Sequence, residues 1–364
     1  MNKNGKAELY RFLFSMIVLL FHCDKYFHGG VSFNNGVHIS LFGHGAVAVE
    51  FFFILSGFLM AKSVFKKLND AVPAEKFYKK YIAFMRHKYT GIYPVHAAAF
   101  VTSFISAVLM YGFKRSQIGY YFLDSLPNLF LVEMSGIRFR DPNHIEWYIS
   151  CMLIGMAILY PILRRHFYAF THYLAPVFSL LAIGFMIHET ESLTGVMTWM
   201  GFCYKSLLRA LCDLALGTTC FEISRAIAAK SFTRRQKAAL TVSEWSLLIV
   251  AVVFALLTLP KQYEAFMPFV FVVMLAVSFS GQSGIARIWN NHFIYHLGKI
   301  SLPIYVGQLT AIYLVRTYVV ELSPTMQILA ATALTFGIAY LLLFVTTVPK
   351  RIAAKRSAKN AAAE

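Results

Sequence analysis

The sequence predicts an all-α, polytopic membrane protein with about ten transmembrane helices. Hydrophobic residues make up 58% of its 364 residues and charged residues only 14%, whereas a soluble domain usually carries about 25% charged residues. The apolar residues are grouped in runs of about 20, the length that an α-helix needs to cross the hydrocarbon core of a bilayer. No stretch of roughly 100 residues, the usual size of a soluble domain, is polar enough to form one.

Ten apolar runs are long enough to be membrane spans. We place them near residues 8–27, 42–63, 91–113, 146–164, 172–189, 205–222, 239–259, 264–281, 295–318 and 326–347. Residues 1–349 are therefore expected to form a single membrane-embedded domain, and residues 350–364 a basic cytoplasmic tail. We expect no appended soluble domain.

A shorter apolar segment at 119–134 is interrupted by Asp124 and Pro127. Lys and Arg residues concentrate in the cytoplasmic loops of membrane proteins. If this segment crossed the bilayer, the basic runs at 164–166 and 234–237 would face outward, so we expect a short interfacial or re-entrant piece instead. With ten spans, the same rule places both termini in the cytoplasm.

The loop at 64–90 has apolar residues at helical spacing. Phe77, Tyr81 and Phe84 stand four and then three positions apart, which puts them on one face of a helix. The pattern predicts an amphipathic helix that lies in the membrane interface before the third span begins.

The formal net charge of +17 would suit a protein that binds nucleic acid. The basic residues, however, stand in short runs between the spans, as they do in loops beside anionic lipid. We therefore expect membrane lipids as partners and no nucleic acid. The five cysteines include no Cys-x-x-Cys pair, and their spacing predicts neither a disulfide framework nor a metal site.

The first span carries a cation and a titratable base. Arg11 and His22 are eleven residues apart, which corresponds to about 1100° of rotation, or about 20° more than three turns. They therefore share one helix face, about 16 Å apart along the axis. Each also has a structural interpretation, Arg11 as a positive-inside anchor and His22 as a hydrogen-bonded interfacial residue.

The second span carries Glu50 inside an apolar run. Ionisable groups are costly in lipid and usually have a partner. If this span enters from the outside near residue 42, Glu50 reaches a depth similar to that of His22. We expect a hydrogen bond between them that holds the imidazole tautomer, with a purely structural helix contact as the alternative. On the sixth span, Arg209 and Asp213 are four apart and are expected to pair.

Several of these segments resemble motifs of the acyltransferase-3 family of membrane proteins. The first is the pair formed by Arg11 and His22 with ten residues between them. The others, in the family's order, are "VEFFFILSGF" at 49–58, "GIYP" at 91–94, "EWYISCMLIGMAILYP" at 146–161 and "LGKISLPIYVGQ" at 297–308. The first two matches together are specific, and the five cover residues 8 to about 308.

The resemblance implies a multi-pass O-acyltransferase of the bacterial cell membrane. Such enzymes typically move an acyl group, often acetyl from acetyl-CoA, to a hydroxyl of a surface polysaccharide or lipid-linked sugar. Acyl-CoA is then a substrate, and no bound cofactor is expected. Arg11 and His22 match the family's functional pair. The chain departs from the family at two places, because Lys88 and Gly91 stand where two arginines are frequent and Gln308 stands where His is frequent.

The resemblance also suggests roles for individual residues. Arg86 and Lys88, together with Arg11, are expected to bind the phosphates of CoA on the cytoplasmic side. His22 is expected to act as a general base or as an acyl relay, with Glu50 as its partner. At the outer start of the fourth span, Trp147 and Tyr148 are expected to stack on a sugar, or else belong to the ordinary interfacial aromatic belt.

Two other functions remain open at the level of the sequence. A membrane transporter or flippase would also have about ten spans with buried charge, but it predicts broken helices in two related halves. We find no such repeat. A non-catalytic component of a glycan-export complex is the second alternative.

Overall fold

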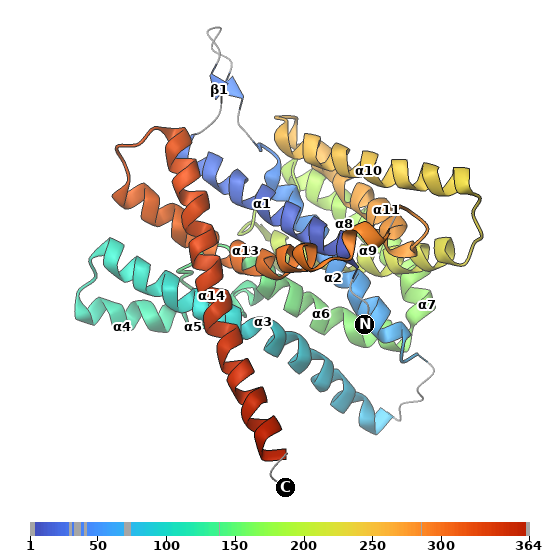
Figure 1. Cartoon of the computed structure of the whole chain (residues 1–364), viewed down its shortest axis with the longest axis horizontal. Helices are drawn as coiled ribbons and strands as arrows, with labels where there is room; N and C mark the ends of the chain where they lie inside the picture. The colour runs from blue at the N-terminus through green and yellow to red at the C-terminus, as the bar shows by residue number, and fades with distance from the viewer. Residues whose placement is uncertain are drawn as a thin grey trace.

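A computed structural model of the chain describes residues 4–28, 31–32, 38–39, 42–68, 74–137, 139–284 and 286–361. Within these residues the protein is almost entirely helical (Figure 1). The strands form two short antiparallel pairs, β1 (Val31–Ser32) with β2 (His38–Ile39) and β3 (Trp199–Met200) with β4 (Cys203–Tyr204). The predicted all-α class is confirmed.

Each of the ten predicted spans overlaps a long helix. These helices are α1 (Gly5–Phe27), α2 (Ala48–Phe65), α3 (Ala74–Tyr111), α6 (Trp147–Arg165), α8 (Ala175–Thr190), α9 (Lys205–Ala228), α10 (Arg234–Leu256), α11 (Met267–Ser280), α13 (His292–Tyr318) and α14 (Pro324–Ala361). The short helical elements are η1 (Gly45–Val47), α4 (Arg115–Asp124), α5 (Leu126–Leu129), η2 (Glu133–Ser135), α7 (Phe167–Ala169), η3 (Phe170–Leu174), η4 (Lys261–Phe266) and α12 (Ala286–Trp289).

Seven helical stretches of the described chain are long and apolar enough to cross a membrane. Three of the predicted spans, on α1, α9 and α13, are not among the seven. Their lengths of 23, 24 and 27 residues still exceed the thickness of a bilayer core, at about 1.5 Å of rise per residue. What distinguishes them is polar side chains, several of which are buried inside the bundle.

The segment at 119–134 contains only short helices. α4 has 10 residues and α5 has 4, so each spans at most about 15 Å, half the thickness of the hydrocarbon core. The structure therefore agrees with the prediction that this segment does not cross the bilayer.

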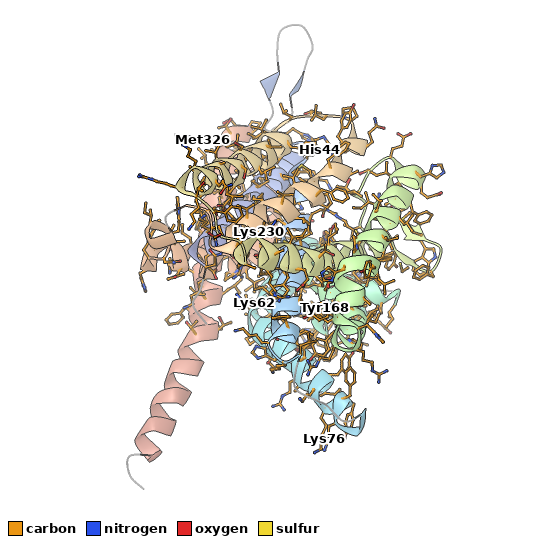
Figure 2. The ribbon with its side chains drawn as sticks, turned by 90° about the vertical axis from the view of Figure 1, so that its right-hand side faces the viewer. His44, Lys62, Lys76, Tyr168, Lys230 and Met326 are labelled. Atoms are coloured by element: carbon orange, nitrogen blue, oxygen red, sulfur yellow. The ribbon has the colours of Figure 1, made fainter. Side chains whose placement is uncertain are left out.

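The helix predicted in the loop at 64–90 is present from Ala74 onward, but it is continuous with the third span. α3 runs without interruption from Ala74 to Tyr111 and passes through Pro94. The predicted apolar face packs against α6 instead, because the ring of Phe84 stacks on Tyr160 with centroids 4.0 Å apart. Figure 2 shows Lys76, near the start of α3, at the lower end of the molecule.

The α2–α9 contact lies at the centre of the bundle, and the two helices pack more extensively than any other pair. Two glycines let their backbones touch. A Cβ atom on Gly57 would lie 2.0 Å from the Leu214 carbonyl oxygen, and one on Gly217 would lie 2.2 Å from that of Ile54. Small residues of this kind allow close helix packing inside membranes, where apolar burial alone gives no preference for helix over lipid.

We expect the Gly57→Ala substitution to prevent normal folding. The added methyl group would collide with main-chain atoms of α9, which cannot rotate away, so the cost should exceed the usual 1–3 kcal/mol of overpacking, at about 3 kcal/mol or more. The measurement is the thermal stability and the monodisperse yield of detergent-purified protein. Gly337→Ala in α14 is the control, because nothing lies within 4 Å of its Cβ position. Equal stability of the two variants would contradict the close packing.

Candidate functional site

His22 lies near the end of α1 with one ring nitrogen fixed and the other available. Its Nδ1 is 2.9 Å from the carbonyl oxygen of Val18. A carbonyl can only accept a hydrogen bond, so Nδ1 carries the proton and Nε2 keeps its lone pair. The side chain of Gln308, from α13, lies next to the imidazole. The arrangement leaves Nε2 able to accept a proton or attack an electrophile.

His22 faces a cavity of about 330 Å³, here called the His22 cavity. Residues from α1, α2, α6, α9 and α13 line it together with residues from η1, η4 and two loops. They are Val18, Phe21, His22, Lys25, Tyr26, Ala46, Val49, His144, Trp147, Thr194, Gly195, Val196, Arg209, Lys261, Tyr305 and Leu309. The base is therefore placed in a space large enough for a small acyl group and its acceptor.

Arg11 faces a second cavity, the Arg11 cavity, of about 200 Å³. Its guanidinium lies 3.2 Å from the Glu8 carboxylate, and the side chain is 36% exposed. The lining residues are Arg11, Ser15, Phe52, Leu55, Ser56, Leu59, Ile92, Tyr148, Ile149, Met152, Ser301, Leu302 and Tyr305. Tyr305 lines both cavities, so this one side chain borders the space beside Arg11 and the space beside His22.

Glu50 does not contact His22, and the predicted hydrogen bond between them is wrong. The Glu50 carboxylate pairs instead with Arg209 of α9, at 2.7 Å from Nε and 2.5 Å from Nη2. Both side chains are buried, with exposed fractions of 0% and 3%. A guanidinium offers several N–H donors in a fixed plane, which makes it a stronger partner for a buried carboxylate than a neutral imidazole.

The predicted pairing of Arg209 with Asp213 is also wrong, because the guanidinium is turned toward α2. Arg209 donates a further hydrogen bond to the Ala46 carbonyl, 3.0 Å away, and its centre lies 5.8 Å from the Trp147 ring. Asp213 accepts a hydrogen bond from the thiol of Cys212. Arg209 lines the His22 cavity, which the sequence analysis did not anticipate. The signal for it was the presence of an arginine within a predicted span, one turn after its start.

Trp147 and Tyr148 are consecutive residues that face different spaces. Trp147 lines the His22 cavity, whereas Tyr148 lines the Arg11 cavity. Successive residues of a helix point about 100° apart, so one span can contribute to both cavities. Their roles in sugar binding stay predictions.

Arg86 and Lys88 line neither the Arg11 cavity nor the His22 cavity. Arg86 is exposed on α3. The Lys88 ammonium lies 5.6 Å from the centre of the Phe84 ring, in a cation–π contact. The part of CoA that Arg86 and Lys88 are expected to contact therefore lies outside the two cavities.

The loop between α8 and α9 covers one side of the His22 cavity and is firmly held. Glu264 accepts hydrogen bonds from the Ser192 hydroxyl at 2.8 Å and from the Leu193 N–H at 3.0 Å. Lys205 donates to the Thr194 carbonyl at 2.6 Å. These contacts fix the cavity wall at Thr194 and Gly195.

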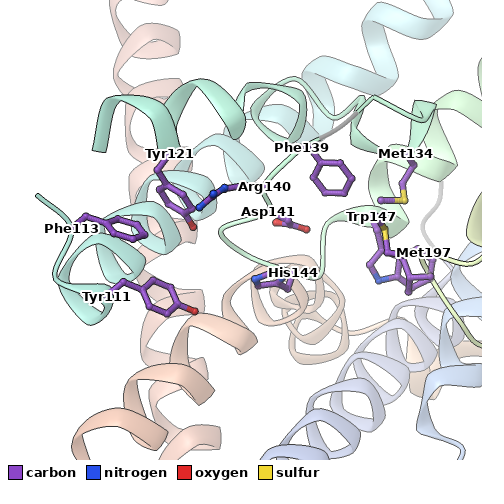
Figure 3. Close-up of a pocket in the computed structure, with 11 residues that line it drawn as sticks. Tyr111, Phe113, Tyr121, Met134, Phe139, Arg140, Asp141, His144, Trp147 and Met197 are labelled. Carbon is purple, nitrogen blue, oxygen red and sulfur yellow. The ribbon is translucent and has the colours of Figure 1, made fainter. Parts of the chain in front are cut away.

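A third cavity, of about 610 Å³, adjoins the His22 cavity and is shown in Figure 3. We call it the aromatic cavity, and its lining is Tyr111, Phe113, Tyr121, Met134, Phe139, Arg140, Asp141, His144, Trp147, Val196 and Met197. His144, Trp147 and Val196 line both this cavity and the His22 cavity. The three cavities thus form a series, with Arg11 beside the first, His22 beside the second and Asp141 beside the third.

Asp141 is the acidic group of the aromatic cavity. Burial raises the pKa of this carboxyl to about 7, and the negative charge of nearby Glu146 acts in the same direction. Its Oδ1 accepts a hydrogen bond of 2.9 Å from the backbone N–H of Asn143. Among the described residues, no group of three His, Cys, Asp or Glu side chains is arranged to hold a metal ion.

Removing one member of the Glu50–Arg209 pair should be strongly destabilising. We expect Glu50→Leu to cost about 3–5 kcal/mol, because it leaves a buried guanidinium without its counter-charge. The double variant Glu50→Leu with Arg209→Met should recover most of that loss, as measured by thermal unfolding in detergent. Asp124→Leu, in an ion pair that is 61% and 55% exposed, is the control and should cost less than about 1 kcal/mol. A double variant no more stable than Glu50→Leu would show that the unpaired Arg209 is not the cause of the destabilisation.

The raised pKa of Asp141 predicts a pH-dependent effect of the Asp141→Asn substitution. Between the ordinary carboxyl pKa and about 7, the folded state binds more protons than the unfolded state, so this group lowers stability as the pH rises. Asparagine carries no charge and can still accept the Asn143 hydrogen bond. The variant should therefore gain more stability over the wild type at pH 8 than at pH 5 in thermal unfolding. A gain in stability that is equal at both pH values would contradict the raised pKa of Asp141.

The chain is similar to a family of known proteins. A family model described as an acyltransferase domain matches residues 5–344, which is nearly the whole chain. The match contains α1 with Arg11 and His22 and α13 with Tyr305 and Gln308. No curated protein and no solved structure matches the chain. The chain therefore belongs to the acyltransferase-3 family and is a multi-pass membrane acyltransferase.

Proposed function

We propose that this protein moves an acyl group, expected to be acetyl, from cytoplasmic acyl-CoA to a hydroxyl of a surface polysaccharide or lipid-linked sugar. One observation carries the proposal. Tyr305 lines both the Arg11 cavity and the His22 cavity, and we propose that the two cavities form one path with a cation beside one end and a base beside the other. An acyl-CoA molecule has phosphates at one end and a thioester at the other, and this path offers a partner for each.

The distribution of charge supports a cytoplasmic position for the Arg11 end. In Figure 2, Lys62 and Lys76 lie in the lower part of the molecule, and His44 and Met326 lie at the upper end. In Figure 1 the C-terminus also lies at the lower end, whereas β1 lies at the top. Because Lys and Arg concentrate on the cytoplasmic side, we propose that both termini are cytoplasmic and that the protein resides in the bacterial inner membrane.

On the donor side, we propose that Arg11 binds a phosphate of CoA. A guanidinium has five N–H donors, and only one edge of Arg11 is directed at Glu8, so donors remain for an anion. Arg86 and Lys88, on the same side, are proposed to contact phosphates that stay outside the cavity. The pantetheine arm then covers the separation of about 16 Å between Arg11 and His22 along α1.

In the reaction we propose, Nε2 of His22 takes the proton of the acceptor hydroxyl as its oxygen attacks the thioester carbon. The new C–O bond replaces the C–S bond, and the leaving CoA sulfur receives the proton from His22. Arg209, in the same cavity, would stabilise negative charge on the thioester oxygen, and Glu50 would hold Arg209 in place. Alternatively, Nε2 attacks the thioester itself and passes the acyl group on. Both routes require the same free nitrogen.

We expect His22→Ala to lower the rate of acyl transfer by about 10²–10⁴-fold, the usual contribution of a positioned base. The assay follows labelled acetyl from acetyl-CoA onto the glycans of membrane vesicles. His188→Ala, an exposed histidine at the end of α8, is the matched control and should keep wild-type activity.

Two results would contradict the proposed function. One is a wild-type protein that moves an unmodified solute across vesicles but transfers no acyl group, which would indicate a transporter. The other is full complementation of glycan modification by His22→Ala in cells, which would indicate a non-catalytic role.

A further inference from the structure

We propose that the aromatic cavity binds the acceptor sugar, that Asp141 accepts a hydrogen bond from one of its hydroxyls, and that His144 positions the reacting hydroxyl toward His22. This inference rests on the proposed function. Apart from Trp147, it assigns the acceptor to residues that the sequence motifs do not include. It also separates the acceptor from the donor, which we place in the Arg11 cavity.

The chemistry of the aromatic cavity suits a pyranose ring. Figure 3 shows Tyr111 and Tyr121 on one side, Trp147 on the other, and Asp141 between them. Aromatic faces can pack against the C–H faces of a sugar, and a carboxyl can accept a hydrogen bond from a hydroxyl. The volume of about 610 Å³ lies in the range of small-molecule sites, about 300–1,000 Å³.

The same cavity is poorly suited to the donor. Among the described residues of its lining, the one Lys or Arg is Arg140, whose guanidinium is 3.2 Å from the carboxylate of Asp124. The other charged group of the lining is Asp141, which would repel phosphate. A polyanion such as acyl-CoA is therefore disfavoured here and favoured beside Arg11.

His144 stands where the acceptor would enter the His22 cavity. Its side chain lines both cavities, and its backbone has φ +57°, in the left-handed region. This conformation costs a non-glycine residue about 1–2 kcal/mol, and such strain is concentrated at functional sites. The turn is held by Asn143, whose side-chain amide donates to the Val306 carbonyl at 2.8 Å. The ring also contacts Tyr313 edge-on, with centroids 6.2 Å apart.

The experiment measures acetyl transfer from labelled acetyl-CoA to a panel of oligosaccharides made of neutral hexose, N-acetylhexosamine or uronic acid. We expect Asp141→Ala and Tyr121→Ala each to raise the acceptor KM by about tenfold, because each removes one contact with the sugar. The acetyl-CoA KM should stay within about twofold of the wild-type value. Tyr120→Ala is the matched control for Tyr121, because Tyr120 is its neighbour on α4 but is 74% exposed.

His144→Gly keeps the left-handed backbone and removes the ring. It should lower kcat for transfer by about tenfold and leave the acetyl-CoA KM within about twofold, because the ring is proposed to position the acceptor and not the donor. Thermal stabilisation by CoA confirms that each variant is folded. His144→Asn, which tolerates the same backbone and keeps a polar side chain, should recover part of the loss.

The possible failures are distinguishable. If the aromatic-cavity variants match Tyr120→Ala in acceptor KM while His22→Ala abolishes transfer, the acceptor site is elsewhere and the proposed function stands. If the wild type acetylates no sugar of the panel, the proposed function fails and this inference fails with it. If His144→Gly raises the acetyl-CoA KM by as much as it lowers kcat, or leaves kcat unchanged, His144 does not position the acceptor and its assigned role is wrong.

Discussion

The ion pair between Glu50 and Arg209 is the interaction on which the arrangement of the site depends. It joins α2 to α9 inside the bundle, where Gly57 and Gly217 already bring the two backbones into contact. By taking up the Glu50 carboxylate, Arg209 leaves His22 without an acidic partner. Nδ1 of the imidazole donates to the Val18 carbonyl, and the side chain of Gln308 lies beside the ring. The same pair also fixes Arg209 beside Trp147 in the wall of the His22 cavity.

The sequence was sufficient for features that depend on length and on the geometry of one helix. Ten apolar runs correspond to ten helices, and Arg11 and His22 lie on one of them, α1, as expected from their position in the first run. It was not sufficient for contacts between helices. Glu50 and Arg209 are 159 positions apart, and nothing in either span indicates which helix lies opposite or how it is rotated. The pairing of Glu50 with His22 was predicted from their similar depth in the membrane, and that of Arg209 with Asp213 from their spacing in the sequence. Neither criterion shows which helices are in contact.

The aromatic cavity was missed for a related reason. Its walls come from the end of α3, from α4, from the turn at 139–144 and from the loop at 196–197, and no local pattern connects these segments. The one usable signal was the cluster of polar residues directly before α6, where Asp141 and His144 precede a span that begins with Trp147. Polar residues at a span entrance are common, so only the three-dimensional structure distinguishes this cluster from an ordinary loop.

The proposed reaction explains why a paired arginine is more useful in this cavity than a single charge. A lone guanidinium would repel the imidazolium that forms when His22 takes a proton, and a lone carboxylate would hold that proton after transfer. The Glu50–Arg209 pair has no net charge, yet its N–H groups remain directed donors in a site of low polarity. It can therefore stabilise a developing oxyanion with little effect on proton transfer. Burying two charges in α2 and α9 costs folding free energy. The buried pair, however, gives the cavity an environment that stabilises the transition state more than the ground state.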